Sequence, residues 1–186
     1  MNWKVNTNSM YLLAIACKCQ KLENLIIYDL KDLTKDAVDL FLSERKKNLK
    51  ILKINGGNSM SGDYLQNLPK CSALVSLEIG RAFRLGISGF DFISKLKNLK
   101  CLEISFTKRA ETLGQDETQD VSSLRPRHLI ALFQNGNLKL LEKLSLAGSE
   151  IMDRHDDNPD DEVLKTIALN CPRLKYLDLY KGTHTQ

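Results

Sequence analysis

Aromatic residues and prolines are scarce in this chain of 186 residues: Phe, Tyr and Trp together make up 6% of it, and only four prolines occur. No continuous apolar run approaches the roughly 18 residues that span a bilayer. The N-terminus also lacks a charged segment that leads into a long apolar one. Leucine is abundant instead, with 32 residues. The sequence therefore predicts one globular domain without a membrane span, with a core built mainly of leucine and isoleucine.

Neither the charge nor the cysteines indicate a specialised class of protein. The net charge is +4, and no basic stripe interleaved with aromatic residues occurs, so we expect no nucleic-acid partner. The densest basic run, Arg45-Lys46-Lys47, is typical of the last turn of a helix. Five cysteines cannot form a complete set of disulfides. We therefore expect reduced thiols and an intracellular location, either cytoplasmic or nuclear.

A short leucine motif recurs along the chain. The pattern Leu-x-x-Leu-x-Leu, with Ile allowed at the last place, occurs six times. The copies begin at Leu22, Leu49, Leu74, Leu99, Leu141 and Leu174, which are separated by 27, 25, 25, 42 and 33 residues. A segment with helical periodicity precedes each copy, at 10–17, 34–42, 62–68, 90–96, 128–133 and 162–169. The motif therefore predicts six strand–helix units of about 26 residues, the last two lengthened by insertions.

The strands alternate between apolar and polar residues, as in Leu77-Glu78-Ile79 and Leu102-Glu103-Ile104. A doubly wound sheet, buried on both faces, would contain strands that are apolar throughout. The alternation instead favours an α/β leucine-rich-repeat solenoid: a right-handed superhelix with a parallel sheet on its concave side, helices on its convex side, and about six repeats. We expect one such domain over residues 1–186, with insertions near 107–125 and 152–161.

Several local features follow from this fold. Thr34 is a plausible N-cap of the second helix. In segment 162–169 we expect Val163, Ile167 and the pair Leu164/Leu169 to face inward. Terminal repeats expose core leucines unless they are capped. We therefore expect that the chain is marginally stable, associates end to end, or belongs to a longer protein.

Cysteines at one recurring place give the repeats a family resemblance. Cys19, Cys71 and Cys171 each stand three residues before the first leucine of a motif. Lys46, Leu96 and Leu138 occupy that place in the other units. The cysteine-bearing units resemble the cysteine-containing repeats of F-box/leucine-rich-repeat proteins, the substrate receptors of cullin-RING ubiquitin ligases.

The resemblance implies a non-enzymatic protein-interaction module that recognises a substrate or partner, within a ubiquitin-ligase assembly if an F-box lies upstream. Only about nine residues precede the first predicted helix. Two interpretations stay open: a fragment of a larger receptor, or a free-standing repeat protein of the same subclass. The alternative function is a structural or assembly subunit of a larger complex that uses the repeats as a scaffold.

No pattern in the chain predicts catalysis, a metal or a cofactor. The three histidines are scattered, and the pair Cys17-x-Cys19 lacks the second pair that a structural zinc requires. The acidic run 155–162 fails as a calcium loop, because Asp161 stands where glycine is needed and Ile167 where glutamate is needed. Asn55-Gly56-Gly57-Asn58 lacks the Lys-Ser/Thr of a phosphate-binding loop. We expect a protein that is not an enzyme and has no cofactor.

The candidate binding surface is the concave face, to which the two-residue period turns the polar strand positions. Apolar and aromatic side chains at water-facing positions are typical of protein-binding patches. The predicted protein-binding residues are Tyr28, Ile51, Lys53, Glu78, Glu103, Tyr176, Asp178 and Tyr180. The polar insertion 108–125 is a second candidate, because a long polar loop in a compact domain is either functional or disordered. Cys71 and Cys171 are expected to be buried, and Cys101, on the concave face, to be the most reactive thiol.

Overall fold

The computed structural model describes residues 2–6, 9–28, 34–55, 61–82, 85–105, 126–147 and 159–179, with the backbone alone at 2–6, 126–127 and 159–160. Its strands are β1 (Asn2–Asn6), β2 (Asn24–Tyr28), β3 (Ile51–Asn55), β4 (Ser76–Gly80), β5 (Cys101–Ser105), β6 (Lys143–Ala147) and β7 (Tyr176–Asp178). Its helices are α1 (Ser9–Lys18), α2 (Lys35–Arg45), α3 (Gly86–Ser94), α4 (Pro126–Gln134) and α5 (Pro159–Asn170), with 3-10 turns η2 (Gly62–Leu65) and η3 (Leu68–Lys70).

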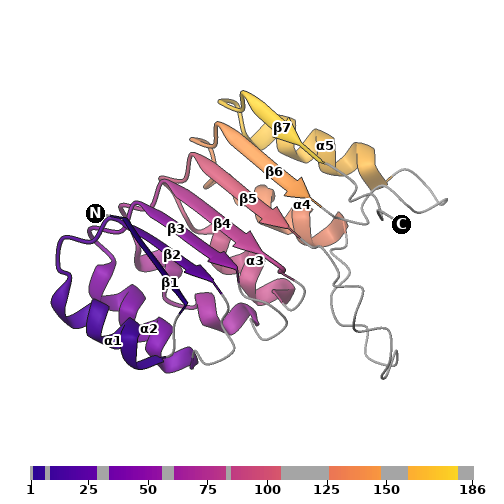
Figure 1. The fold of residues 1–186 in the computed structure, drawn as a ribbon. Coiled ribbons are helices and arrows are strands. Elements are labelled where there is room, and N and C mark those ends of the chain that lie inside the picture. Colours follow the sequence, from indigo (N-terminus) through magenta and orange to yellow (C-terminus); the bar gives the residue numbers. More distant parts are fainter. Residues whose placement is uncertain are drawn as a thin grey trace, which may run out of the picture.

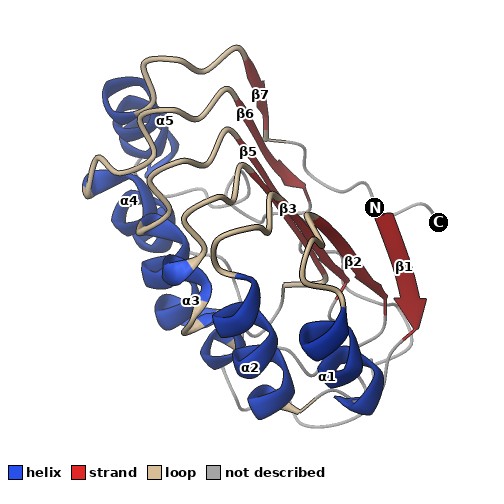
Figure 2. Ribbon diagram, turned by 90° about the vertical axis from the view of Figure 1, so that its left-hand side faces the viewer, coloured by secondary structure: helices blue, strands red, loops and turns tan. Residues whose placement is uncertain are grey.

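All seven strands form one parallel sheet, and they lie in the sheet in the order of the sequence (Figure 1). The helices lie side by side along one face of this sheet (Figure 2). Parallel neighbours require a connection that crosses back over the sheet, and the helical segments make that connection on the same side each time. The predicted α/β class with an all-parallel sheet is confirmed.

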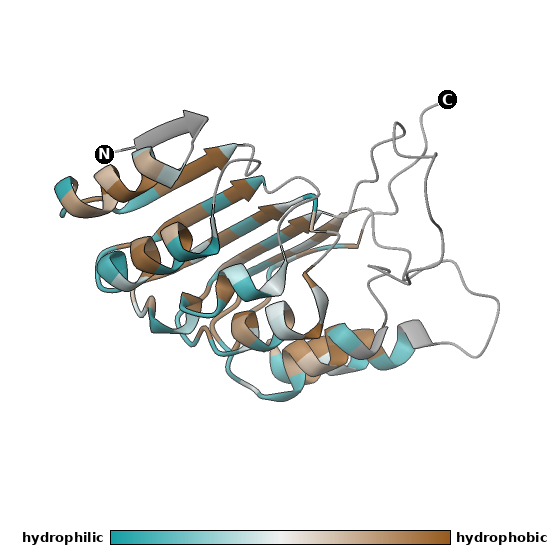
Figure 3. Ribbon diagram, turned by 90° about the horizontal axis from the view of Figure 1, so that it is seen from below, coloured by the Kyte–Doolittle hydropathy of each residue, from teal (hydrophilic) through white to brown (hydrophobic). Residues whose placement is uncertain are grey.

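The six leucine motifs supply β2 to β7 in a single register. The second leucine of each motif pairs with its counterpart in the next strand, so that Leu25, Leu52, Leu77, Leu102, Leu144 and Leu177 form one row across the sheet. Within each of β2 to β6 burial alternates, with the second and third motif residues buried and the positions around them half-buried. The buried apolar residues of the strands and helices form one core cluster, and Figure 3 shows how apolar and polar residues alternate along these elements.

Strand β1 was missed by the sequence analysis, which assigned no structure to the residues before the first helix. It pairs parallel to β2, with Trp3 in register with Leu25 and Val5 in register with Ile27. The alternation of Trp3 and Val5 with Asn2, Lys4 and Asn6 is the signal that was available. β1 has no Leu-x-x-Leu-x-Leu motif, so a search for that repeat does not find it.

Hydrogen bonds tie each of β3 to β7 to the preceding strand at the point where it begins. The carbonyl of Glu23 accepts from the backbone N–H groups of Lys50 and Ile51, at 2.7 and 3.0 Å. The same pair of bonds recurs at the carbonyls of Lys50, Val75, Lys100 and Glu142. The side chains of Asn48 and Asn98 add donors to the preceding unit, to the carbonyls of Gln20 and Ser72. The register of the leucine row is therefore held at the strand entrances as well as in the sheet.

The helical layer differs in part from the expectation. Thr34 is confirmed as an N-cap, because its side chain accepts from the backbone N–H of Ala37. The expected helix over 62–68 is replaced by the 3-10 turns η2 and η3, which Gln66 and Asn67 separate. Pro69, which has no N–H to continue a helix, lies within η3. Gly62 in η2 lies so close to α3 that a Cβ there would come within 2.4 Å of the backbone nitrogen of Gly89. That contact excludes a side chain at Gly62, whereas a Cβ on Gly89 would come within 2.5 Å of the Leu85 side chain.

The last helix is longer than predicted and faces differently. It begins at Pro159, so residues 159–161 belong to α5 and not to an insertion. Val163 and Ile167 are buried as expected, but Leu164 is 38% exposed and Leu169 is 73% exposed. The expected inward positions of those two leucines are wrong, because at 100° per residue only every third or fourth residue faces the sheet.

The third and sixth units each have a cysteine three residues before the first leucine of the motif. Cys71 and Cys171 are both buried, as predicted. In the second unit the residue turned inward is Arg45 and not Lys46, which is exposed. The guanidinium of Arg45 donates to the carbonyl of Cys19 at 3.1 Å. A buried cation therefore joins the first and second units at a place where other units have an uncharged side chain.

We predict that Leu102→Ala lowers the free energy of unfolding by about 2–5 kcal/mol, because Leu102 is fully buried in the middle of the row. Leu169→Ala removes the same atoms from an exposed position and is expected to change stability by less than about 1 kcal/mol. Urea unfolding followed by circular dichroism measures both. Equal losses in the two variants would contradict the register described above.

Candidate protein-interaction face

One face of the sheet points away from the helices (Figure 2), and we call it the open face. Every second side chain of β2 to β6 points to it, and these side chains are half-buried by their neighbours in the adjacent strands. In the described part of the chain no helix lies over it. The open face is thus an accessible surface built from strand side chains in fixed register.

Charged side chains from neighbouring strands form ion pairs across its centre. Lys53 on β3 pairs with Glu78 on β4, with Nζ 2.5 Å from Oε2, and these residues are partners in the strand register. The hydrogen bond to Glu78 is the main cause that raises the pKa of Lys53 above its usual value, against the opposing effect of burial. Both side chains keep about two fifths of their surface exposed, so the pair contributes little stability and stays available to a partner.

A second ion pair lies on the next strands. Lys143 on β6 donates to Glu103 on β5 at 2.8 Å, and the thiol of Cys101 lies 3.4 Å from the same carboxylate. Burial opposes ionisation of Glu103, but the hydrogen bonds from Lys143 and Cys101 and the nearby charges of the lysines hold its pKa below the usual value. Glu103 is therefore a carboxylate in neutral solution.

Two carboxylates of like charge stand side by side at the centre of the open face. Glu78 and Glu103 are direct partners in the register of β4 and β5, where like charges repel. Each is neutralised from its outer side, Glu78 by Lys53 and Glu103 by Lys143. The charges therefore run in the order positive, negative, negative, positive along the sheet.

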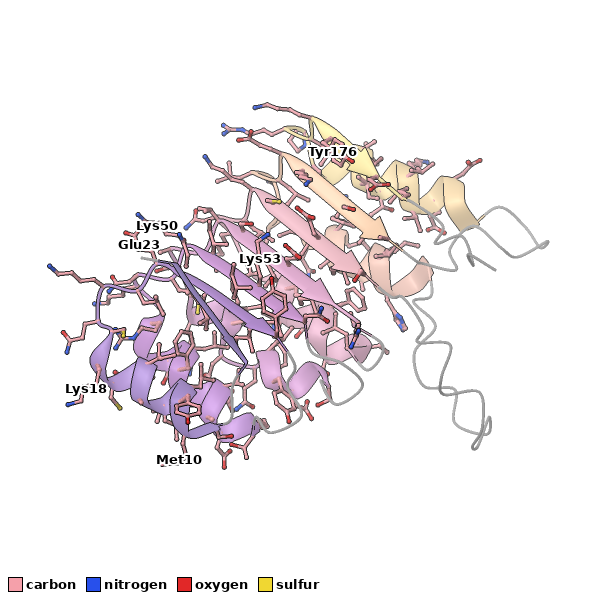
Figure 4. All side chains as sticks on the ribbon, viewed as in Figure 1. Met10, Lys18, Glu23, Lys50, Lys53 and Tyr176 are labelled. Atoms are coloured by element: carbon pink, nitrogen blue, oxygen red, sulfur yellow. The ribbon has the colours of Figure 1, made fainter. Side chains whose placement is uncertain are left out.

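An aromatic side chain lies at the β7 end of the face. Tyr176 is 50% exposed, and the ammonium of Lys143 lies 5.3 Å from the centre of its ring. Next to it, the Ser145 hydroxyl lies 3.1 Å from a carboxylate oxygen of Asp178. Lys53 and Tyr176 are labelled on β3 and β7 in Figure 4, with three strands between them.

Most of the predicted binding residues lie on this one face. Tyr28 and Ile51 stand half-buried on β2 and β3, at the opposite end from Tyr176. Tyr180 and the candidate loop 108–125 lie outside the described residues. Lys143 was not among the predicted binding residues, although it contacts both Glu103 and Tyr176. Lys143 lies at a polar position of the same apolar–polar alternation as the predicted residues, so this alternation in the sequence could have identified it.

The described residues offer little for chemistry. Among them no group of three His, Cys, Asp or Glu side chains is arranged to hold a metal ion. Burial raises the pKa of Cys71 and of Cys171 to about 11, which makes both poor nucleophiles. His128 stacks against Phe90, with ring centres 5.9 Å apart. In the same part of the chain, no helix is both long and apolar enough to cross a membrane.

Comparison with known proteins leaves the resemblance seen in the sequence as an expectation. The chain matches no protein-family model and no curated protein sequence. The strand register, the ion pairs and the exposed aromatic side chain therefore carry the functional argument.

We predict that a thiol reagent labels Cys17 first and Cys71 and Cys171 last. Cys17 is exposed at the end of α1, whereas the other two are buried thiols with a pKa of about 11. The sequence alone predicts that Cys101 reacts first. Burial and the neighbouring Glu103 raise the pKa of Cys101, despite an opposing hydrogen bond from Ser76. We now expect it to react after Cys17.

Absorbance kinetics with a chromogenic disulfide reagent at pH 8 follow the labelling, and mass spectrometry of the peptides locates it. Cys17→Ser is expected to remove the fastest phase alone. Labelling of native Cys171 at the rate of Cys17 would contradict the burial of that residue beneath the sheet.

Proposed function

We propose that the chain is a leucine-rich-repeat solenoid whose open face, its concave side, binds a protein partner without catalysis. The observation that carries the proposal is the half-exposed Tyr176 at a strand position turned away from the core. A tyrosine supplies a large contact area at a small cost in side-chain entropy, and aromatic residues are enriched in protein interfaces. At the other end of the face, the half-buried Ile51 and Tyr28 add apolar and aromatic surface.

Three features support the repeat assignment. The strands follow one another in order within a single parallel sheet. The second leucines of all six motifs are in register. The strand entrances repeat the same hydrogen bonds. Stacked strand–helix units that bury a common leucine row are what a solenoid requires.

The favoured role is recognition of a substrate or partner, as in the F-box/leucine-rich-repeat receptors that the cysteine-bearing units resemble. The partner would be a folded protein with a basic side chain opposite Glu78 and Glu103 and acidic groups opposite Lys53 and Lys143, since those charges face it. The alternative is a scaffold subunit of a larger complex, which uses the same face for a permanent contact. A substrate would be bound transiently and ubiquitinated, whereas a fellow subunit would co-purify in constant ratio.

We predict that Tyr28→Ala and Tyr176→Ala each weaken binding of a protein partner by about 1–3 kcal/mol, as truncation of an interface anchor does. The double variant should lose more than either single variant. The measurement is quantitative affinity capture from cell extract, with each recovered protein compared between the native chain and the variants by mass spectrometry.

Ile87→Ala serves as the matched control, because Ile87 is an exposed apolar side chain on α3, in the helical layer. It should recover the same proteins as the native chain. If the tyrosine variants also recover them in native amounts, the open face is not the binding surface, and segment 108–125 becomes the candidate to test by substitution.

A further inference from the structure

The connections that lead from the helical layer back into the sheet are rich in cations. They are the ranges 19–23, 46–50, 66–75, 95–100, 135–142 and 171–175, and the structure describes all of them without a gap. They carry 11 of the chain's 27 lysines and arginines but only two of its 23 acidic residues, Glu23 and Glu142. All 11 cations are exposed. We call these 11 residues, on the side of the molecule where the strands begin, the basic rim.

The stacking of the units aligns the cations of the basic rim. One set directly follows the first leucine of the motif, where the strand entrances are joined by hydrogen bonds: Lys50, Lys100 and Lys175. A second set stands two residues before that leucine: Lys47, Lys97 and Lys139. Figure 4 labels Lys50 beside Glu23 on this side of the molecule. Neighbouring strands lie about 4.8 Å apart, so the rim is about 24 Å long from β2 to β7.

Most of these charges are not neutralised within the described part of the chain. Three of the 11 form ion pairs at 2.6 to 2.7 Å: Lys50 with Glu23, Lys95 with Asp91 and Lys175 with Glu142. Every side chain in these pairs keeps at least a third of its surface exposed, so each pair can open at little cost. The other eight cations form no ion pair with a described residue.

The charges of separate units act together on this rim. Glu142, in the connection to β6, accepts a hydrogen bond from Lys175, and that bond is the main cause of its lowered pKa. The charges of Lys175, Lys100 and Arg173 lower it further. Lys100 belongs to the fourth unit, and Lys175 and Arg173 belong to the sixth. Cations from both sides therefore converge on one carboxylate.

The ends of the helices do not account for the whole rim. A cation stabilises a helix through its macrodipole only near the last turn. Lys46, Lys47 and Lys95 stand one or two residues beyond a helix and fit that role. The set at the strand entrances stands five or six residues beyond a helix: Lys50, Lys100 and Lys175. Like charges held together repel in the free chain, and an anionic partner would relieve that repulsion.

We infer that the basic rim binds the phosphate backbone of a double-stranded nucleic acid without reading its sequence. Nucleic-acid interfaces are strongly positive, whereas lysine is depleted and aromatic residues are enriched in protein interfaces. The six connections contain no Phe, Tyr or Trp, on which the bases of a single strand would stack. They also contain none of the exposed large apolar side chains of the described chain, which would anchor the rim in a bilayer.

The sequence alone predicts no nucleic-acid partner, because no continuous stretch forms a basic stripe. The rim is assembled from six separate connections, so it exists only once the units are stacked. The inference does not rest on the function proposed for the open face, since it concerns the strand entrances.

Fluorescence anisotropy of labelled DNA and RNA duplexes of about 20 base pairs, titrated with the full chain, tests the inference. We expect dissociation constants of about 1–10 µM at about 50 mM salt, with less than about threefold difference between unrelated DNA sequences. The logarithm of the association constant for DNA should fall with that of the salt concentration with a slope of about −4, as for four or five neutralised phosphates. Lys97→Gln/Lys100→Gln should weaken binding at least about tenfold and make the slope shallower by about 2.

Lys35→Gln/Lys165→Gln is the matched control, because it removes the same charge from α2 and α5, away from the strand entrances. It should weaken binding by less than about twofold. Equal losses in the two double variants, or no binding of either duplex, overturns the inference. Tighter binding of phosphatidylserine vesicles or of polyglutamate in the same salt would assign the rim to a membrane or an acidic protein instead, and also overturns it. Circular dichroism checks that both variants fold.

Discussion

The in-register row of leucines beneath the sheet is the constraint on which the rest of this structure depends. Each strand buries one leucine between its two neighbours, so the burial of every member depends on the strands on both sides. Leu77 and Leu102 are fully buried for that reason, and Leu177 is not, because only β6 flanks it within the described chain. A structure stabilised in this way has interactions between nearest neighbours, and its weak points are its ends. β1 meets that need at one end without a leucine motif of its own.

The same register leaves the opposite side of the strands without a packing requirement. Because side chains alternate, fixing the leucines also fixes which residues stand together on the open face. Lys53, Glu78 and Glu103 lie in one line for this reason alone. The strand register therefore fixes the order of their charges. In the proposed role, such a preorganised pattern would favour recognition, because less entropy is lost on binding.

Prediction from the sequence succeeded where one residue type repeats at a fixed interval. The alternation of leucine with polar residues predicts the six motif strands and the burial of Cys71 and Cys171. It also predicts that Lys53 and Glu78 lie on the open face. It failed where contacts between units decide the structure. Arg45 is buried because the Cys19 carbonyl lies within reach in the neighbouring unit, and η2 is a tight turn beside Gly89 of α3. The ion pair of Lys143 with Glu103 spans forty residues of sequence and is visible only once the strands are aligned. Periodicity within one segment contains none of these contacts.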